Sequence, residues 1–201
     1  MVKIKAKVKG GNREVFKFSV SKLGVLFAGS KNGSVPEETC NRLIKELGDR
    51  GFGFWVGCSS GVSSCFRKAL INSEYIDKSF VGCAFISRAK TISKTGLFAS
   101  VVSPKNLTGK SAVIRRTLWL IKRASLVVLF PDNPNTGKWD KESKIIFNSS
   151  LYQLKPVFVV SSHPVGETSY YRVIPSILHG VEGYWAVPEP IEEGGFCDDE
   201  F

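Results

Sequence analysis

Short runs of apolar residues recur along the chain, separated by longer segments whose apolar positions follow a helical spacing. We expect strands at Leu23–Ala28, Phe52–Val56, Phe80–Phe85, Leu97–Val102, Leu126–Phe130 and Val157–Val160. The intervening segments predict helices at Pro36–Arg50 (with Ser34 as N-cap), Val62–Ile71, Ser111–Arg123 and Lys141–Leu154. The strand runs are continuous rather than alternating, as expected when helices cover both faces of a parallel sheet. The pattern predicts a three-layer, Rossmann-like α/β domain with a mostly parallel sheet.

The two ends of the chain differ from this central pattern. The first residues alternate apolar and basic side chains before a Gly-Gly-Asn turn, which predicts a basic N-terminal hairpin over residues 1–22. The Rossmann-like domain is then expected at residues 23–160. Residues 161–188 form a C-terminal extension that we expect to pack on the domain, with helix potential around Tyr171–Leu178. Residues 189–201 are rich in Pro, Glu and Gly and predict a flexible acidic tail.

Charge is distributed unevenly along the 201 residues, which carry a net charge of +10. Met1–Lys22 carries seven basic residues against Glu14 alone, and Ile86–Arg123 carries nine basic residues and no acidic one. By contrast, Glu182–Phe201 carries seven acidic residues and no Lys or Arg. The basic segments should attract a polyanionic partner.

Two further observations limit the compartment and the chemistry. No apolar run approaches the roughly 18 residues that cross a bilayer, and the start of the chain lacks the apolar centre of a secretory signal. We therefore expect a soluble, cytoplasmic protein with no membrane partner. The five cysteines form no CxxC pair and are accompanied by only two histidines. We expect free thiols, no metal and no cofactor.

Small, hydrogen-bonding residues follow the ends of the first two predicted strands. They are Gly29 and Ser30 after the first strand, and Gly57, Ser59, Ser60 and Gly61 after the second. At the carboxyl ends of parallel strands, such loops expose amide N–H groups and the positive ends of helices, which bind anions. The alternative is that these glycines only turn the chain.

Two other segments should face the same crevice. Arg115 and Arg116 precede the fifth strand, while the segment after it supplies two polar residues and a glycine that could bind phosphate. The alternative is that the arginines lie on a solvated helix face, and Asp140 is expected to N-cap the following helix. The residues predicted to bind a nucleotide or its phosphate are Gly29, Ser30, Lys31, Gly57, Ser59, Ser60, Gly61, Arg115, Arg116, Thr136, Gly137 and Lys138.

Four segments, taken in order, resemble a known family. They are GSK at Gly29–Lys31, GCSSGVSSCFRKAL at Gly57–Leu70, IRRTLWLIKRASLVVLF at Ile114–Phe130 and NTGKWDKESKIIFNSSLYQLKPVFVV at Asn135–Val160. Their order is similar to that of the DNA-processing protein A (DprA/Smf) family. More broadly, it resembles the superfamily that these proteins share with the Lonely-guy (LOG) nucleotide phosphoribohydrolases.

Individual positions match the DprA motifs closely at some points and depart from them at others. The family's GSR reads GSK here, its GGARGID reads GCSSGVS, and the second arginine of its RNR falls on Arg116. Its SGS region falls on residues 136–138. Ser63 stands in place of the family's aspartate and Lys138 in place of a serine. The pattern of contacts can therefore survive while the ligand differs.

The resemblance implies a Rossmann-like protein that binds single-stranded DNA in a basic pocket without cutting it. It also implies a homodimer and a recombinase partner, hence a role in DNA processing or recombination. The acidic tail resembles the tip of bacterial single-stranded DNA binding proteins, which docks on partner proteins. The alternative is a tail that solubilises the chain or folds back on its basic surface.

The superfamily offers two rival functions. LOG-like enzymes hydrolyse the N-glycosidic bond of nucleoside monophosphates with an arginine and a glutamate from a PGGxGTxxE loop. This chain reads PDNPNTGKWDKE, so the catalytic candidates under that hypothesis are Arg115, Arg116, Asp140 and Glu142. The third hypothesis is a sensor that binds a nucleotide-derived signal in the same crevice.

Overall fold

The computed structural model describes residues 23–104, 106–133, 136, 138–163 and 166–189. The predicted hairpin at 1–22 and, beyond Glu189, the predicted acidic tail lie outside the described residues. Within the described part of the chain, no helix combines the length and apolar character needed to cross a membrane.

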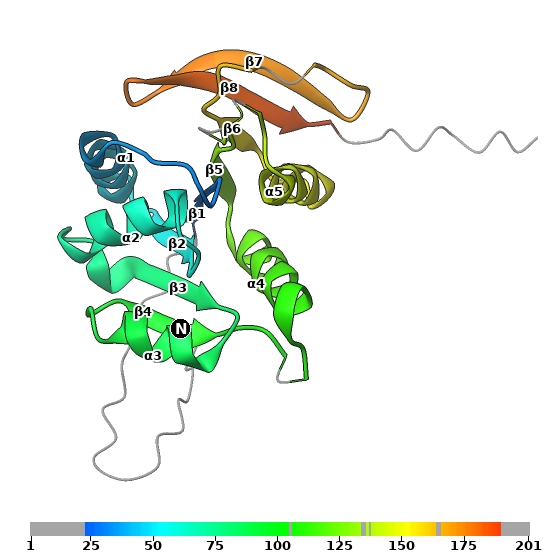
Figure 1. Ribbon diagram of the computed structural model, residues 1–201. Coiled ribbons are helices and arrows are strands. Elements are labelled where there is room, and N and C mark those ends of the chain that lie inside the picture. Colours follow the sequence, from blue (N-terminus) through cyan, green and yellow to red (C-terminus); the bar gives the residue numbers. More distant parts are fainter. Residues whose placement is uncertain (1–22, 105, 134–135, 137, 164–165, 190–201) are drawn as a thin grey trace, which may run out of the picture.

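The described residues form one eight-stranded sheet with helices on both faces (Figure 1). The strands are β1 (Gly24–Gly29), β2 (Gly53–Gly57), β3 (Ser79–Cys83), β4 (Phe98–Val101), β5 (Leu126–Phe130), β6 (Val157–Val159), β7 (Tyr171–Leu178) and β8 (Val181–Pro188). The helices are α1 (Glu37–Asp49), α2 (Val62–Ile71), α3 (Ile86–Ser93), α4 (Gly109–Arg123) and α5 (Lys141–Tyr152), with a short 3-10 turn at Ile76–Lys78.

The sheet order is β4-β3-β2-β1-β5-β6-β8-β7, and the first six strands in this order are parallel. The chain moves outward from β1 to β4, then α4 carries it back across the sheet to β5 on the other side of β1. This reversal is the topological switch of doubly wound folds. The predicted Rossmann-like α/β architecture with a mostly parallel sheet is therefore confirmed.

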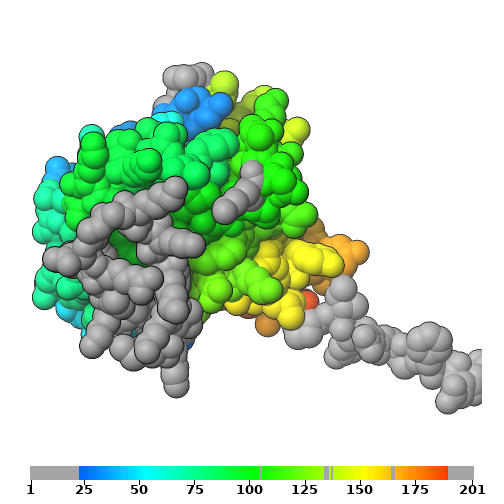
Figure 2. All heavy atoms as spheres, turned by 90° about the horizontal axis from the view of Figure 1, so that it is seen from below, coloured from blue at the N-terminus to red at the C-terminus, as the bar shows by residue number. Residues whose placement is uncertain are grey.

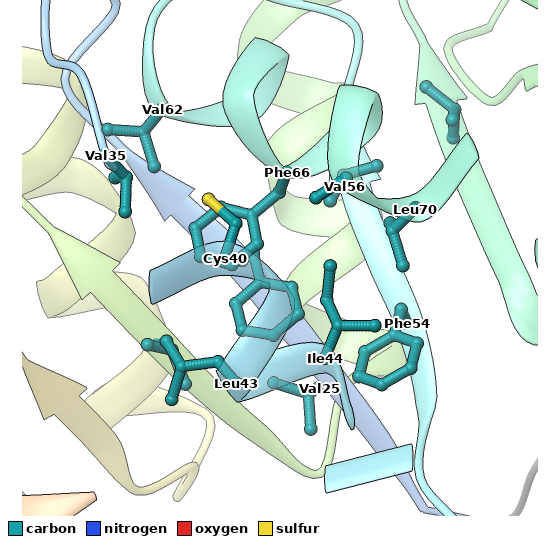
Figure 3. Packing of buried hydrophobic residues seen from close by; sticks show 14 of the residues in the cluster. Val25, Val35, Cys40, Leu43, Ile44, Phe54, Val56, Val62, Phe66 and Leu70 are labelled. Carbon is teal, nitrogen blue, oxygen red and sulfur yellow. The ribbon is translucent and has the colours of Figure 1, made fainter. Parts of the chain in front are cut away.

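Alternate residues of each central strand enter two separate cores. In β1, Val25 and Phe27 face α1 and α2, whereas Leu26 and Ala28 face α4 and α5. Figure 3 shows side chains of β1, β2, α1 and α2 converging in the first core. Its tightest aromatic contact stacks Phe66 on Phe27, with ring centroids 3.9 Å apart. Burial on both faces explains why the strands read as unbroken apolar runs.

The C-terminal extension corrects one prediction. Tyr171–Leu178 is strand β7, not a helix, and it pairs with β8, which in turn pairs antiparallel with β6. His179 and Gly180 connect the two strands, and both have positive φ, 48° and 77°. Two consecutive left-handed residues give the tight turn that suits the twist of a hairpin. Burial alternates along β7 except at Ile174 and Pro175, which are both exposed, and only Tyr171 is buried, as expected for a strand at the edge of a sheet.

Hydrogen bonds to nearby residues of the same chain occupy part of the outer edge of β7. The amide of Tyr171 donates to the Thr168 carbonyl, and the amide of Val173 donates to Glu167 Oε1 at 3.0 Å. Pro175, the next residue on that side, has no N–H to offer. These features disfavour the addition of another strand.

Smaller differences concern the ends of elements. Helix α1 begins at Glu37, and its N-cap residue is Pro36 rather than the predicted Ser34. No side chain among the described residues caps this end of the helix by a hydrogen bond. Strand β3 ends at Cys83, and Ile86–Ser93 forms helix α3, which the apolar pattern did not predict. Helix α3 buries only Ala89 and Ile92, while its first residue, Ile86, is exposed, so its periodic signal is weak.

Phe66 and Phe85 provide a test of the first core. Phe66 is fully buried, while Phe85 is 39% exposed. We expect Phe66→Ala to lower the free energy of unfolding by about 3–5 kcal/mol because it opens a cavity against Phe27. Phe85→Ala should cost less than about 1 kcal/mol. Urea unfolding followed by circular dichroism measures both, and equal losses would contradict this account of the core.

Candidate functional site

A small pocket with one apolar and one polar wall lies at the topological switch, where β1 has β2 on one side and β5 on the other. Its apolar wall consists of Leu26, Phe27, Ala28, Leu120 and Ile146. Its polar lining consists of Gly29, Gly57, Ser59, Ser63, Arg116, Thr117 and Glu142. These residues come from the ends of β1 and β2, from the start of α2 and from helices α4 and α5. The volume is about 20 Å³, which suits one water-sized group.

Arg116 is the central side chain of this pocket and is only 4% exposed. Its Nη2 donates to Thr117 Oγ1 and to Glu142 Oε1, both at 3.0 Å. Its Nη1 lies 3.6 Å from Cys58 Sγ. The Nε–H of Arg116 is buried and has no hydrogen-bond partner among the described residues. A buried donor of a charged group that lacks an acceptor is costly, so an acceptor brought next to Nε would stabilise this guanidinium.

The start of α5 contributes more than Glu142. Asp140 accepts a 2.7 Å hydrogen bond from the Ser143 amide, which confirms the predicted N-cap. Asp140 Oδ2 and Ser143 Oγ are buried and, like Arg116 Nε, have no partner among the described residues. Unused polar atoms therefore occur on both helices that border the pocket.

The loops after β1 and β2 pack directly on each other. The Ser30 carbonyl accepts from the amides of Gly33 and Val62, and the Ser30 amide donates to the Phe130 carbonyl at 2.9 Å. Ser60 Oγ donates to the Lys31 carbonyl at 3.0 Å. The polar groups of the buried Ser30 thus hold the loops together, while the side chains of Lys31 and Ser60 remain exposed.

Two arginines that the sequence analysis did not select hold the β2–α2 loop. Arg67 donates to the carbonyls of Gly57 and Ser59, and Arg88 donates to the Cys58 carbonyl at 3.3 Å. Burial lowers the pKa of the Arg67 guanidinium. Arg67 lies in the segment Gly57–Leu70 that carries the family resemblance, but the carbonyl acceptors of both arginines become visible only in three dimensions.

Arg115 does not line this pocket, although it is the neighbour of Arg116 in sequence. It lines a groove of about 800 Å³ between α4 and α5, together with Trp119, Lys122 and Tyr152. Consecutive helical residues point about 100° apart, which separates the two guanidinium groups. Figure 2 shows the green and yellow surfaces of this part of the chain side by side.

The other predicted residues divide between the pocket and its surroundings. Gly29, Gly57 and Ser59 line the pocket; Gly61 lies where the two loops meet. Thr136 and Lys138 are exposed on the connection from β5 to α5 and do not line it, and Gly137 lies outside the described residues. Thr117 was not predicted to belong to the pocket.

Comparison with known proteins adds a fold relationship. No protein-family model and no curated protein matches the chain. Among solved structures, it is similar to DNA processing protein A from Helicobacter pylori, with 16% identity, a TM-score of 0.53, and 74% of this chain and 69% of that chain covered. The chain shares the fold of that protein. It is also similar to the structural genomics target TM1055, with 15% identity, a TM-score of 0.38, and 67% and 72% of the two chains covered.

Two glycines with positive φ test how tightly the loops of the pocket are packed. Gly61 has φ +65°, and a Cβ there would lie 2.3 Å from the Ser30 carbonyl oxygen. Gly51 has φ +87° with nothing within 4 Å of such a Cβ. We expect Gly51→Ala to cost about 1–2 kcal/mol from backbone strain alone, and Gly61→Ala to cost clearly more. Chemical denaturation measures the difference, and equal costs would show that the two loops separate easily.

Proposed function

We propose that the protein binds single-stranded nucleic acid, with an oxygen atom of one nucleotide in the pocket at the switch between β1 and β5. The observation that carries this proposal is the buried Nε–H of Arg116, which has no acceptor among the described residues. An oxygen atom of the ligand would complete the hydrogen bonding of this guanidinium.

The size of the pocket determines how a nucleotide would lie. A volume of about 20 Å³ excludes a base or a whole phosphate group, so the body of the ligand lies outside, over the loops. Lys31 and Lys138 are exposed on two of the neighbouring connections and supply positive charge for the backbone of a strand. The net charge of +10 favours such a partner and predicts that affinity falls with salt.

The shared fold supports the same proposal. DNA processing protein A from Helicobacter pylori is described by its single-stranded DNA binding mode. On this basis we extend the proposal for the present chain to a role in DNA processing or recombination in the cytoplasm. The proposal also includes a homodimer and a partner protein that binds the acidic tail.

A second candidate function, hydrolysis of the N-glycosidic bond of a nucleotide, is favoured by one specific contact. Arg116 and Glu142, two of the four catalytic candidates, form a 3.0 Å ion pair in the wall of the pocket. Glu142 is 28% exposed, so its carboxylate can reach a ligand while Arg116 holds it in place. A carboxylate and a guanidinium at a sugar are the groups that the LOG resemblance requires.

Binding to a short labelled single strand tests the first function. Arg116→Gln should weaken binding about 10- to 100-fold, the loss expected for one charge-assisted hydrogen bond. Arg115→Gln, on the neighbouring residue outside the pocket, is the matched control and should cost much less. Fluorescence anisotropy over a salt series measures both variants, with thermal melts to establish that each is folded. Equal weakening by the two variants would reject the pocket as the binding site.

Glu142→Gln separates the two candidate functions. For a protein that only binds, removal of this carboxylate should leave affinity unchanged or tighter, because it removes a negative charge near the strand. For a hydrolase, the same change should abolish release of free base from nucleoside monophosphates, measured by chromatography. Base release by the unmodified protein that disappears in Glu142→Gln would establish the enzyme. No base release together with titratable strand binding would exclude it.

A further inference from the structure

Two thiols lie side by side at the carboxyl ends of neighbouring strands. Gly57 of β2 is paired with Gly82 of β3, so the residues that follow them, Cys58 and Cys83, are also neighbours. Adjacent strands lie about 4.8 Å apart, within the range of about 4.4–6.8 Å between Cα atoms that a disulfide spans. The Cys58 and Cys83 side chains interact with each other, and the Cys83 Sγ also lies 4.0 Å from the Val81 carbonyl oxygen, a further acceptor for its proton.

The surroundings of Cys58 stabilise a negative charge on its sulfur. Besides the Cys83 thiol, the backbone of Ala84 provides a hydrogen bond and Arg116 Nη1 lies 3.6 Å away. The hydrogen bond from Cys83, followed by these other contacts, lowers the pKa of Cys58 to about 5. The same hydrogen bond and burial raise the pKa of Cys83. The pair thus combines an ionised thiol with a protonated one, the arrangement of a reactive and a resolving cysteine.

Cys40 is a matched thiol without these contacts. It is also buried, and burial raises its pKa to about 12. Burial is therefore common to Cys40 and Cys58, and the hydrogen bonds and the nearby guanidinium distinguish them. This contrast makes Cys40 an internal control for reactivity in the same chain.

The pocket lies next to Cys58, although Cys58 does not line it. The sulfur is buried, but Gly57 and Ser59 on either side of it line the pocket, as does Arg116, which contacts it. The pocket admits a group about the size of water, and hydrogen peroxide, with one more oxygen atom than water, is the smallest hydroperoxide.

We infer that Cys58 and Cys83 are a redox-active pair that a hydroperoxide converts into a disulfide. The Cys58 thiolate attacks the terminal oxygen of the hydroperoxide, the O–O bond breaks, and Cys58 becomes a sulfenic acid as an alkoxide or hydroxide leaves. The Cys83 thiol then attacks the sulfenic sulfur, an S–S bond forms, and the hydroxyl departs with the thiol proton as water. Two electrons pass from the two sulfurs to the hydroperoxide.

This chemistry does not depend on the proposed function, because it uses the two thiols and their neighbours alone. Its consequence does involve Arg116, which loses an anionic partner when the Cys58 sulfur enters a disulfide. The oxidation state of the pair would thereby alter the pocket in which Arg116 lies.

Treatment of the reduced full-length chain with hydrogen peroxide tests the inference. Alkylation of remaining thiols and peptide mass mapping should identify a Cys58–Cys83 disulfide, with Cys58 consumed at least about tenfold faster than Cys40. In Cys83→Ser, where no resolving thiol is present, dimedone should trap a sulfenic acid on Cys58. Cys65→Ser is the control for a half-buried thiol elsewhere and should leave the disulfide unchanged.

Measurements on the unmodified protein are enough to refute the inference. The test therefore does not require that any variant folds. Oxidation of Cys58 at the rate of Cys40, or peroxide-induced disulfides that exclude Cys58 and Cys83, would refute it. If the reduced protein does not bind the strand while peroxide still forms the Cys58–Cys83 disulfide, the proposed function is refuted and the thiol chemistry stands.

Discussion

A buried guanidinium needs partners for both its charge and its N–H groups, and Arg116 has this requirement where α4, α5 and the end of β2 meet. Its contacts join α4 to Glu142 of α5 and to Cys58 at the end of β2. Removing one partner from a buried ion pair typically costs about 3–5 kcal/mol, so the pair ties the positions of α4 and α5 to each other. A Cβ on Gly57 would lie only 3.3 Å from Arg116 Nη1, so a larger residue there would crowd the guanidinium.

The sheet topology explains why this arginine, the pocket and the thiol pair occur together. The switch between β1 and β5 leaves the carboxyl ends of β1 and β2 open to side chains from α4 and α5. The parallel register of β2 and β3 brings Cys58 and Cys83 to the same edge of the sheet. One edge of the fold therefore carries both the pocket and the thiol pair, and Arg116 contacts both.

The sequence predicts the central sheet well because burial on both faces requires continuous apolar runs. Leu126–Phe130 and Val62–Ile71 have the predicted bounds, and Asp140 caps α5 as its position suggests. The apolar pattern predicts an element less well where one face of that element is solvated. Apolar and polar residues alternate only weakly along β7, so the sequence predicts a helix there instead of a strand.

For the pocket, the sequence identifies the two glycine- and serine-rich loops and Arg116, but it does not separate Arg116 from Arg115. That distinction depends on the rotation of α4 against the sheet. The sequence also does not identify Cys58 as a contact of Arg116. A cysteine inside an apolar segment is usually an inert core residue. Its partners, Arg116 and Cys83, are 58 and 25 residues away in sequence and meet it only through the packing of α4 and the pairing of β2 with β3.

The paired charges in the pocket limit which oxygen atom it can hold. A phosphate oxygen would accept from Arg116 but would meet the Glu142 carboxylate, which repels it. A hydroxyl group can accept from Arg116 Nε–H and donate to Glu142, so it satisfies both residues at once. Sugar hydroxyls occur along RNA, in mononucleotides and at the ends of DNA strands, so for DNA the proposed function places the nucleotide at the end of a strand in the pocket. The ion pair thus favours a nucleotide with a free sugar hydroxyl in the pocket and its phosphates over the exposed lysines of the loops.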